Sequence, residues 1–169
     1  MHRNADNSPR PVKPVVLPLK LDKCLSCCTI VLHRISGGFM DVIIDTSALV
    51  AVIVGEPERD RIVEITIENS LIGPGSIPWE IGNAFSAMFK QNRLTLKEAQ
   101  KGLAIFQSIP IRYMEADFDN VLKLSKNTNM YAYDAYFLDC AIRRKAPLLT
   151  LDRNLKAAAQ NINIEILEV

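Results

Sequence analysis

Four acidic residues are placed where their carboxylates can act together: Asp45, Glu80, Asp134 and Asp152. Asp45 ends the apolar run VIID and Asp152 follows the run APLLTL, so each comes after an expected strand. Glu80 and Asp134 lie near the starts of two expected helices. Taken singly, each is better explained by helix capping, because acidic residues stabilise helix N-termini. Taken together, the four predict an acidic site.

Such a group of carboxylates favours the binding of a hard divalent cation. Two carboxylates about 4 Å apart repel each other by roughly 4 kcal/mol at an effective dielectric near 20. Four of them together therefore require protonation or a neutralising cation. The only histidines are His2 and His33, which excludes imidazole-based chemistry from residues 40–169. Oxygen ligands select Mg²⁺ or Mn²⁺ over zinc, and such ions support hydrolysis of phosphodiester bonds.

Three hydroxyl residues stand beside these acids: Thr46, Ser47 and Thr150. Their hydroxyl groups are expected to orient a carboxylate or a bound water. Helix capping by Thr46 and Ser47, and a place within a strand for Thr150, explain these residues equally well.

Basic and aromatic residues near the acids suggest how a phosphate chain would bind. Arg153 and Lys156 begin the helix that follows Asp152, and we expect them to contact phosphate. The basic residues 143–145 end a helix and are expected to be solvated there. Trp79, next to Glu80, either packs in the core or stacks on a base, and packing is the more common role.

Alternating strand and helix patterns position these residues. Strands are expected at 41–45, 70–74, 109–114, 146–150 and 162–169, and helices at 46–54, 58–69, 77–93, 95–108, 117–129, 133–145 and 152–160. Strands separated by helices predict an α/β sandwich with a mainly parallel sheet, in which ligands bind at the carboxyl ends of the strands. On helical wheels, Glu80 and Asp134 lie about 80° and 90° from the centre of the apolar stripe, at its boundary with solvent, whereas Asp139 lies about 130° from that centre and should face solvent.

Residues 1–39 differ in composition from residues 40–169. They carry six Lys or Arg against two Asp or Glu, whereas residues 40–169 carry fourteen against seventeen. The acidic balance of the main part excludes binding of polyanions by bulk charge. We expect residues 1–39 to be a disordered tail or a misassigned extension, with Met40 as the natural start, and residues 40–169 to form the domain.

Cysteine and hydropathy patterns favour a cytoplasmic protein. Three of the four cysteines crowd at 24, 27 and 28, without a regular framework, so reduced thiols are expected. Together with His33 they suggest zinc, but no second pair stands at zinc-finger spacing. No apolar run reaches the roughly 18 residues needed to cross a membrane, and the N-terminal pattern fits a signal peptide poorly.

The motifs VIIDTSAL, PWEIGNA, YDAYFLDCA and APLLTLDRNL, in this order, resemble the PIN-domain ribonuclease family. Within that family the likeness is greatest to the VapC-type toxins of toxin–antitoxin pairs, and it covers residues 40–169. The resemblance implies a PIN-like three-layer α/β/α sandwich. It also implies that Asp45, Glu80, Asp134 and Asp152 bind the metal, assisted by Thr46 or Ser47 and by Thr150 of the family's T-x-D element.

The resemblance further implies Mg²⁺- or Mn²⁺-dependent endonucleolytic cleavage of RNA. It implies a homodimer, and inhibition by a small antitoxin protein that covers the acidic cleft in a hetero-oligomer. One alternative is a catalytically silent PIN-like module that only binds a partner, but four mutually repelling carboxylates argue against that reading. Another is a phosphatase with an aspartyl nucleophile, which usually has a second aspartate two residues after the first, where this chain has Ser47.

Overall fold

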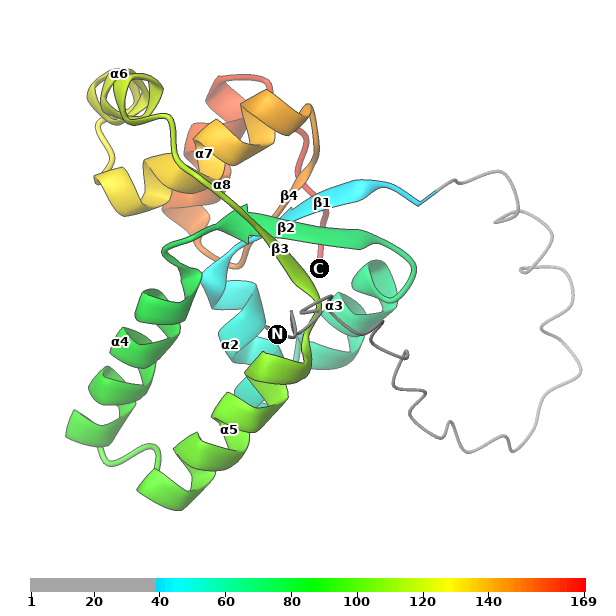
Figure 1. Cartoon of the computed structure of the whole chain (residues 1–169), viewed down its shortest axis with the longest axis vertical. Helices are drawn as coiled ribbons and strands as arrows, with labels where there is room; N and C mark the ends of the chain where they lie inside the picture. The colour runs from blue at the N-terminus through cyan, green and yellow to red at the C-terminus, as the bar shows by residue number, and fades with distance from the viewer. Residues whose placement is uncertain (1–38) are drawn as a thin grey trace, which may run out of the picture. The chain divides into compact units, whose positions relative to one another are not determined.

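A computed structural model describes residues 39–169 of the chain (Figure 1). Its four strands form one parallel sheet in the order β3-β2-β1-β4. They are β1 (Asp41–Ile44), β2 (Ser70–Pro74), β3 (Ile111–Met114) and β4 (Leu148–Leu149). The two central strands are mostly apolar, and Val42 and Ile43 of β1 are fully buried, as expected for a sheet covered on both faces.

Helices cover the two faces of this sheet, which confirms the expected three-layer sandwich (Figure 1). One layer contains α2 (Thr46–Val54), α3 (Arg59–Thr66), α4 (Ile77–Lys90) and α5 (Leu96–Ser108). The other contains α6 (Phe118–Thr128), α7 (Ala132–Arg144) and α8 (Arg153–Asn161). None of the helices that the structure describes is long and apolar enough to span a membrane.

Local sequence signals account for several helix ends. Gly55 ends α2 in the left-handed conformation, with φ of 79°, a geometry that glycine adopts without steric cost. Thr95 and Glu98 form the expected capping box at the start of α5: the Glu98 N–H donates to Thr95 Oγ1 at 3.3 Å, and the Thr95 N–H donates to Glu98 Oε2 at 2.8 Å. These ends are therefore set by neighbouring residues.

The expected strand at 162–169 is wrong. The segment makes one isolated parallel bridge, between Leu148 and Ile166, through hydrogen bonds from the Leu148 N–H to Glu165 O and from the Leu167 N–H to Leu148 O. Its alternating pattern is that of a strand, but its partner β4 has only two residues. A ladder needs a partner of matching length, so the segment pairs at a single point.

The expectation that Asp139 faces solvent is also wrong, because its side chain is fully buried. Helix α6 packs against that side of α7, which a helical wheel of α7 alone does not reveal. The carboxylate accepts hydrogen bonds from the Asp117 N–H at 3.2 Å, Asn120 Nδ2 at 2.7 Å and Arg143 at 3.1 Å. These bonds compensate the cost of burying the charge.

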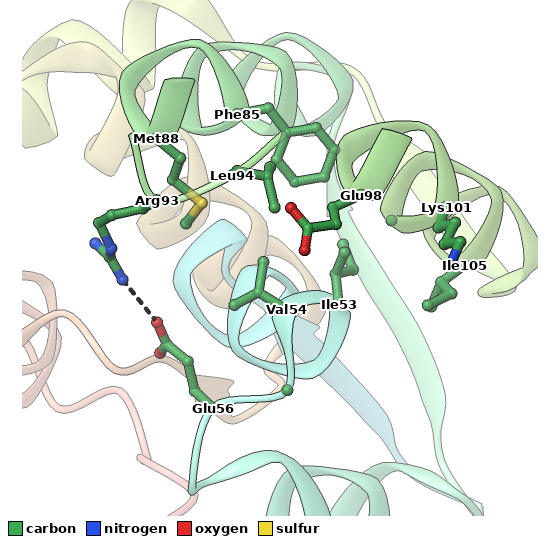
Figure 2. A pocket seen from close by; sticks show the side chains of 12 residues that line it. Ile53, Val54, Glu56, Phe85, Met88, Arg93, Leu94, Glu98, Lys101 and Ile105 are labelled. Carbon is green, nitrogen blue, oxygen red and sulfur yellow. Dashed lines mark ion pairs between the residues drawn. The ribbon is translucent and has the colours of Figure 1, made fainter. Parts of the chain in front are cut away.

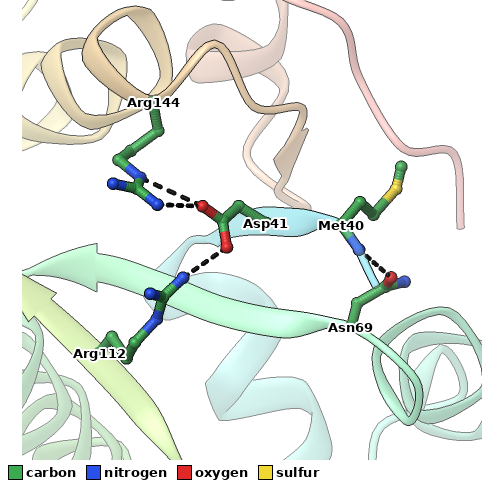
Figure 3. Close-up of polar contacts among 5 residues, drawn as sticks. All are labelled: Met40, Asp41, Asn69, Arg112 and Arg144. Atoms are coloured by element: carbon green, nitrogen blue, oxygen red, sulfur yellow. Dashed lines mark hydrogen bonds and ion pairs between the residues drawn. The ribbon is translucent and has the colours of Figure 1, made fainter. Parts of the chain in front are cut away.

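A second group of charges lies at the amino end of the sheet (Figure 3). Asp41, the first residue of β1, forms ion pairs with Arg112 of β3 and Arg144 of α7, and the Met40 N–H donates to Asn69 Oδ1 at 3.2 Å. Arg143 and Arg144 are exposed, as expected, and each side chain also forms an ion pair. The ion pairs of Asp41 therefore link β1 to β3 and α7 at the edge of the sheet opposite the predicted acidic site.

Glycine permits the close approach of α5 to its neighbours in the same layer. A Cβ atom on Gly102 would lie 2.8 Å from Ile53 Cγ2 and 3.1 Å from Phe85 Cζ. On Gly82, in the exposed part of α4, a Cβ atom would meet nothing within 4 Å. Only the first of these two helical glycines is required by packing.

Of the four cysteines, only Cys140 lies within the described residues. Cys140 of α7 is a free, buried thiol, and burial together with the nearby Asp139 charge raises its pKa to about 12. It acts as a small core residue. The cluster of Cys24, Cys27, Cys28 and His33, and the expected extension that contains it, lie outside the described residues.

Candidate acidic active site

Asp45 links the end of β1 to the start of α2. Its Oδ2 atom accepts hydrogen bonds from the Ser47 N–H at 3.2 Å, from the Ser47 hydroxyl and from Thr150 Oγ1 at 2.8 Å. Only 6% of the residue is exposed. Burial raises the pKa of Asp45, and the hydrogen bonds from Ser47 and Thr150 partly oppose that rise. The residue caps α2, but its two bonds to hydroxyl groups exceed what a cap needs.

Two hydroxyl groups connect Asp45 to the segment that carries Asp152. Ser47 Oγ lies 3.4 Å from Thr150 Oγ1 and accepts a hydrogen bond from the Leu151 N–H at 3.0 Å. Thr150 Oγ1 accepts one from the Asp152 N–H, also at 3.0 Å. The polar groups that follow β1 and β4 therefore form one connected network at the carboxyl ends of these adjacent strands.

Glu80 enters the site from the first turns of α4. One carboxylate oxygen accepts a hydrogen bond from Ser76 Oγ at 2.6 Å and the other from Thr46 Oγ1 at 2.8 Å. The half-buried side chain has a raised pKa, chiefly because of burial and further because of the negative charges of Asp45 and Asp134. Sequence reasoning missed Ser76, although its spacing of four residues from Glu80 places both on one face of the helix.

Asp134 lies in the first turn of α7 but does not cap it. Tyr131 is the N-cap residue, and the end has no side-chain capping bond. Asp134 is half-buried, and its pKa is raised by burial, by the charge of Asp152 and by that of Asp45. Neither Asp134 nor Glu80 makes a side-chain capping bond, and the Glu80 carboxylate bonds to two hydroxyl groups instead, although both acids lie in a first turn where the helix dipole favours them.

Asp152 is exposed and caps α8. One of its oxygens accepts hydrogen bonds from the Asn154 N–H at 2.7 Å and the Leu155 N–H at 3.0 Å. Its charge acts on Asp134 nonetheless. For Asp152, capping and a place in the acidic site are compatible, because both require the start of α8 to lie at this edge of the sheet.

The carboxylates interact through their charges, but their present arrangement does not form a complete metal-binding site. Among residues 39–169, no three His, Cys, Asp or Glu side chains are arranged so that they could hold one metal ion. The available donors are carboxylate and hydroxyl oxygens, the type that Mg²⁺ and Mn²⁺ prefer. The donor chemistry therefore fits a hard cation, and binding would require the acidic side chains to draw together.

The two predicted phosphate contacts differ in their surroundings. Arg153 is exposed and forms no ion pair with the described residues. Lys156 Nζ forms an ion pair with Glu168 near the chain's C-terminus. Because that pair is largely exposed, it adds little stability, and Lys156 is available only once the pair opens.

Besides a hollow of about 380 Å³ that is lined in part by Asp134, the described residues form two larger ones. The first, about 550 Å³, lies beside the acidic residues and includes Ser76 and five aromatic side chains; we call it the aromatic pocket. The second, about 470 Å³, lies among α2, α4 and α5 and contains the ion pair between Arg93 and Glu56, at 3.9 Å (Figure 2). None of the four predicted acids lines the second hollow.

Comparisons with known proteins agree with this architecture. The family model for the PIN domain matches residues 42–161. The chain is similar to the crystal structure of PAE2754 from Pyrobaculum aerophilum, with 21% identity and a TM-score of 0.57 over 74% of this chain and 84% of that one. It is also similar to VapBC2 from Rickettsia felis, solved bound to a DNA fragment from their promoter, with 18% identity and a TM-score of 0.53 over 76% and 98% of the two chains. No curated protein matches the chain.

Proposed function

Because this chain belongs to the PIN-domain family, whose members are generally nucleases, we propose that it is a Mg²⁺- or Mn²⁺-dependent endoribonuclease. The observation that carries the proposal is the group of mutually interacting carboxylates at the carboxyl edge of the sheet. Three of them have pKa values raised by burial, and the charge of another acid adds to the rise for Glu80 and Asp134. Structural groups rarely accumulate uncompensated like charge, whereas sites that bind a cation require it.

The proposed roles follow from the position of each side chain. Asp45, Glu80, Asp134 and Asp152 would hold the cation, which when bound makes a water more acidic and neutralises charge on the phosphate. Ser47 and Thr150 hold Oδ2 of Asp45, so its other oxygen is the one left for a ligand. Glu80 is held in place by Ser76 and Thr46. A half-buried carboxyl with a raised pKa is also suited to accept a proton from the attacking water.

Arg153 and Lys156 are the proposed contacts to the phosphate chain. Arg153 is the better placed of the two, because it is exposed and forms no ion pair within the described part of the chain. Lys156 must first leave Glu168. Substitution of either residue should weaken RNA binding and reduce its salt dependence.

We further propose that the protein is the toxin of a toxin–antitoxin pair in the cytoplasm, acting as a homodimer and inhibited by a small antitoxin protein. The motif order of the sequence and the fold shared with VapBC2 support this assignment. Co-expression with the neighbouring reading frames, followed by purification through a tag on this chain, tests it. Recovery of a stoichiometric small protein that stops cleavage is the expected result.

The absence of a finished three-ligand group within residues 39–169 favours one alternative, a catalytically silent module that binds a partner. Cleavage of a labelled total-RNA pool with Mg²⁺, Mn²⁺ or EDTA, beside Asp45→Asn, separates the two functions. The endoribonuclease gives discrete, metal-dependent fragments that the variant does not produce. Thermal unfolding with and without Mg²⁺ supplies a readout independent of activity: Mg²⁺ at about 100 times its Kd should stabilise the wild type by roughly 2.7 kcal/mol and Asp45→Asn much less. If the wild type shows no cleavage and is not stabilised by metal, the result indicates the silent module.

A further inference from the structure

The aromatic pocket is built from three separate segments of the chain, within residues 74–79, 113–118 and 133–136, that meet at the carboxyl edge of the sheet. Its walls come from the end of β2, the start of α4, the end of β3 with the segment after it, and the first turns of α6 and α7. Five aromatic rings line it: Trp79, Tyr113, Phe118, Tyr133 and Tyr136. Its volume, about 550 Å³, lies within the range of sites that bind small organic groups.

Three of the five rings are more than half exposed, so burial in the core does not explain them. Trp79 is 73% exposed, Phe118 65% and Tyr133 56%, and all three contribute to one hollow. Single exposed aromatic residues are ordinary, but a contiguous group of them marks a binding surface. The expectation that Trp79 packs in the core is therefore wrong, and its alternative role, stacking on a base, remains.

Three of the rings contact one another. Tyr136 packs edge-to-face against Phe118, at a centroid distance of 6.1 Å and an angle of 87°, and against Tyr133, at 5.8 Å and 80°. Edge-to-face packing fixes these rings relative to one another and does not require the face of each to be covered. The pocket is thus partly preorganised for a flat group.

The pocket adjoins the acidic site directly. Ser76 lines it and donates its hydroxyl hydrogen to Glu80 Oε1 at 2.6 Å. Trp79 precedes Glu80 and Tyr133 precedes Asp134, so each of these two rings is attached next to a site carboxylate. An RNA strand with a phosphate at the acidic residues would therefore place a neighbouring nucleotide at the pocket.

The polar rim of the pocket favours a neutral group with N–H donors. Two polar residues, Glu115 and Tyr113, are among those that line it, and both are exposed. Arg143 holds this rim, because its guanidinium donates to the backbone oxygen of Glu115 at 2.7 Å and to buried Asp139 at 3.1 Å. A carboxylate repels phosphate but accepts hydrogen bonds from the exocyclic amino groups of adenine, cytosine and guanine, whereas uracil offers only its ring N3–H as a donor.

We propose that the aromatic pocket binds one unpaired nucleobase of the RNA substrate, stacked on Trp79, and that Glu115 favours an amino-bearing base over uracil. The inference rests on the proposed ribonuclease function and adds to it a specificity-determining subsite. The proposed occupant is a base, and the competing occupant is an apolar side chain of a protein partner.

Trp79 supplies the assay, because it is the only tryptophan in the chain. The full-length Asp45→Asn protein, which should bind RNA without cutting it, is titrated with short oligomers of adenylate, cytidylate and uridylate while tryptophan fluorescence is recorded. Stacking should quench the emission with adenylate and cytidylate at lower concentrations than with uridylate. Glu115→Gln should reduce that preference.

Variants in the otherwise unmodified protein then connect the pocket to catalysis. Trp79→Ala should raise KM roughly 5- to 100-fold with kcat little changed, because stacking acts on bound substrate and transition state alike. Trp79→Phe, which keeps a ring, should recover most of the loss. Phe89→Ala is the matched control, since Phe89 is a partly exposed aromatic residue near the other end of α4 and lies outside the pocket; its KM should not change.

The results distinguish this inference from the proposed function. Quenching by RNA without cleavage by the wild type would support the pocket and contradict the nuclease. Cleavage by the wild type, with no quenching by any oligomer and an unchanged KM for Trp79→Ala, would overturn the pocket and leave the rings to a protein partner. Equal quenching by all oligomers would retain the stacking role and refute the selection by Glu115.

Discussion

The two roles of Asp152, helix cap and site carboxylate, can be separated by two substitutions at one position. Asp152→Ala removes the acceptor for the Asn154 and Leu155 N–H groups, whereas Asp152→Asn keeps an acceptor and removes only the charge. Asparagine and aspartate are about equally good N-cap residues. The proposed function requires the charge, so both variants should lose cleavage while only the alanine variant loses stability.

The size of the effect follows from the two capping bonds, at 2.7 and 3.0 Å. Loss of such a cap costs about 0.5–2 kcal/mol. For a domain of this size, 1 kcal/mol lowers Tm by roughly 4 °C. In Asp152→Asn, the lost attraction to the α8 dipole, about 0.3–1 kcal/mol, is offset by relief of the repulsion from Asp134, so its Tm should stay close to that of the wild type.

The assay pairs thermal unfolding of the metal-free protein with cleavage of the RNA pool at saturating Mg²⁺. Thr95→Ala is the matched control, because Thr95 caps α5 through its own capping box. That variant should lose a similar stability and cleave at the wild-type rate below its Tm. Cleavage at the wild-type rate by Asp152→Asn would refute the catalytic role of Asp152, and equal destabilisation by asparagine and alanine would refute the capping argument.

Three further predictions concern stability. Burial raises the pKa values of Asp45, Glu80 and Asp134, so these three groups favour folding of the metal-free protein most below about pH 4, and their contribution falls as pH rises through their folded-state pKa values. Denaturant unfolding of Asp45→Asn should show a shallower fall of stability with pH, and an unchanged slope would contradict the assignment. In urea unfolding, Gly102→Ala should lower the free energy of unfolding by about 1–3 kcal/mol through overpacking, whereas Gly82→Ala should raise it by about 0.5–1 kcal/mol. Equal effects of the two substitutions would show that α5 can shift. Asp139→Ala should lower the free energy of unfolding by roughly 3 kcal/mol, because it leaves buried donors unpaired. A loss of less than about 1 kcal/mol would show that water replaces the carboxylate.

Local patterns predicted most of the fold. The apolar run 42–44 and the helix that ends at Gly55 were expected from period and turn chemistry alone, and so was the capping box at Thr95. The prediction of a strand at 162–169 was wrong because an alternating pattern shows only that a segment is able to form a strand. Whether it does depends on the length of β4, which lies elsewhere in the sequence.

The candidate site divides in the same way. Strand ends and helix starts were enough to bring the four acids to one edge of a parallel sheet. The contacts that hold them there were not predictable, since Thr46 bonds to Glu80 across 34 residues and Thr150 bonds to Asp45 across 105. Ser76 escaped notice because a serine before a helix ordinarily has only a capping role.

The sequence by itself thus determined the order of strands and helices, the edge at which the carboxylates gather and the oxygen-donor chemistry they offer, because periodicity, capping and residue type are local properties. Only the tertiary structure decided that Asp139 is buried, that hydroxyl groups from other segments hold Asp45 and Glu80, and that the exposed rings of Trp79 and Tyr133 line one pocket. Those features depend on which surfaces pack together, and packing joins residues whose separation along the chain carries no signal of their contact.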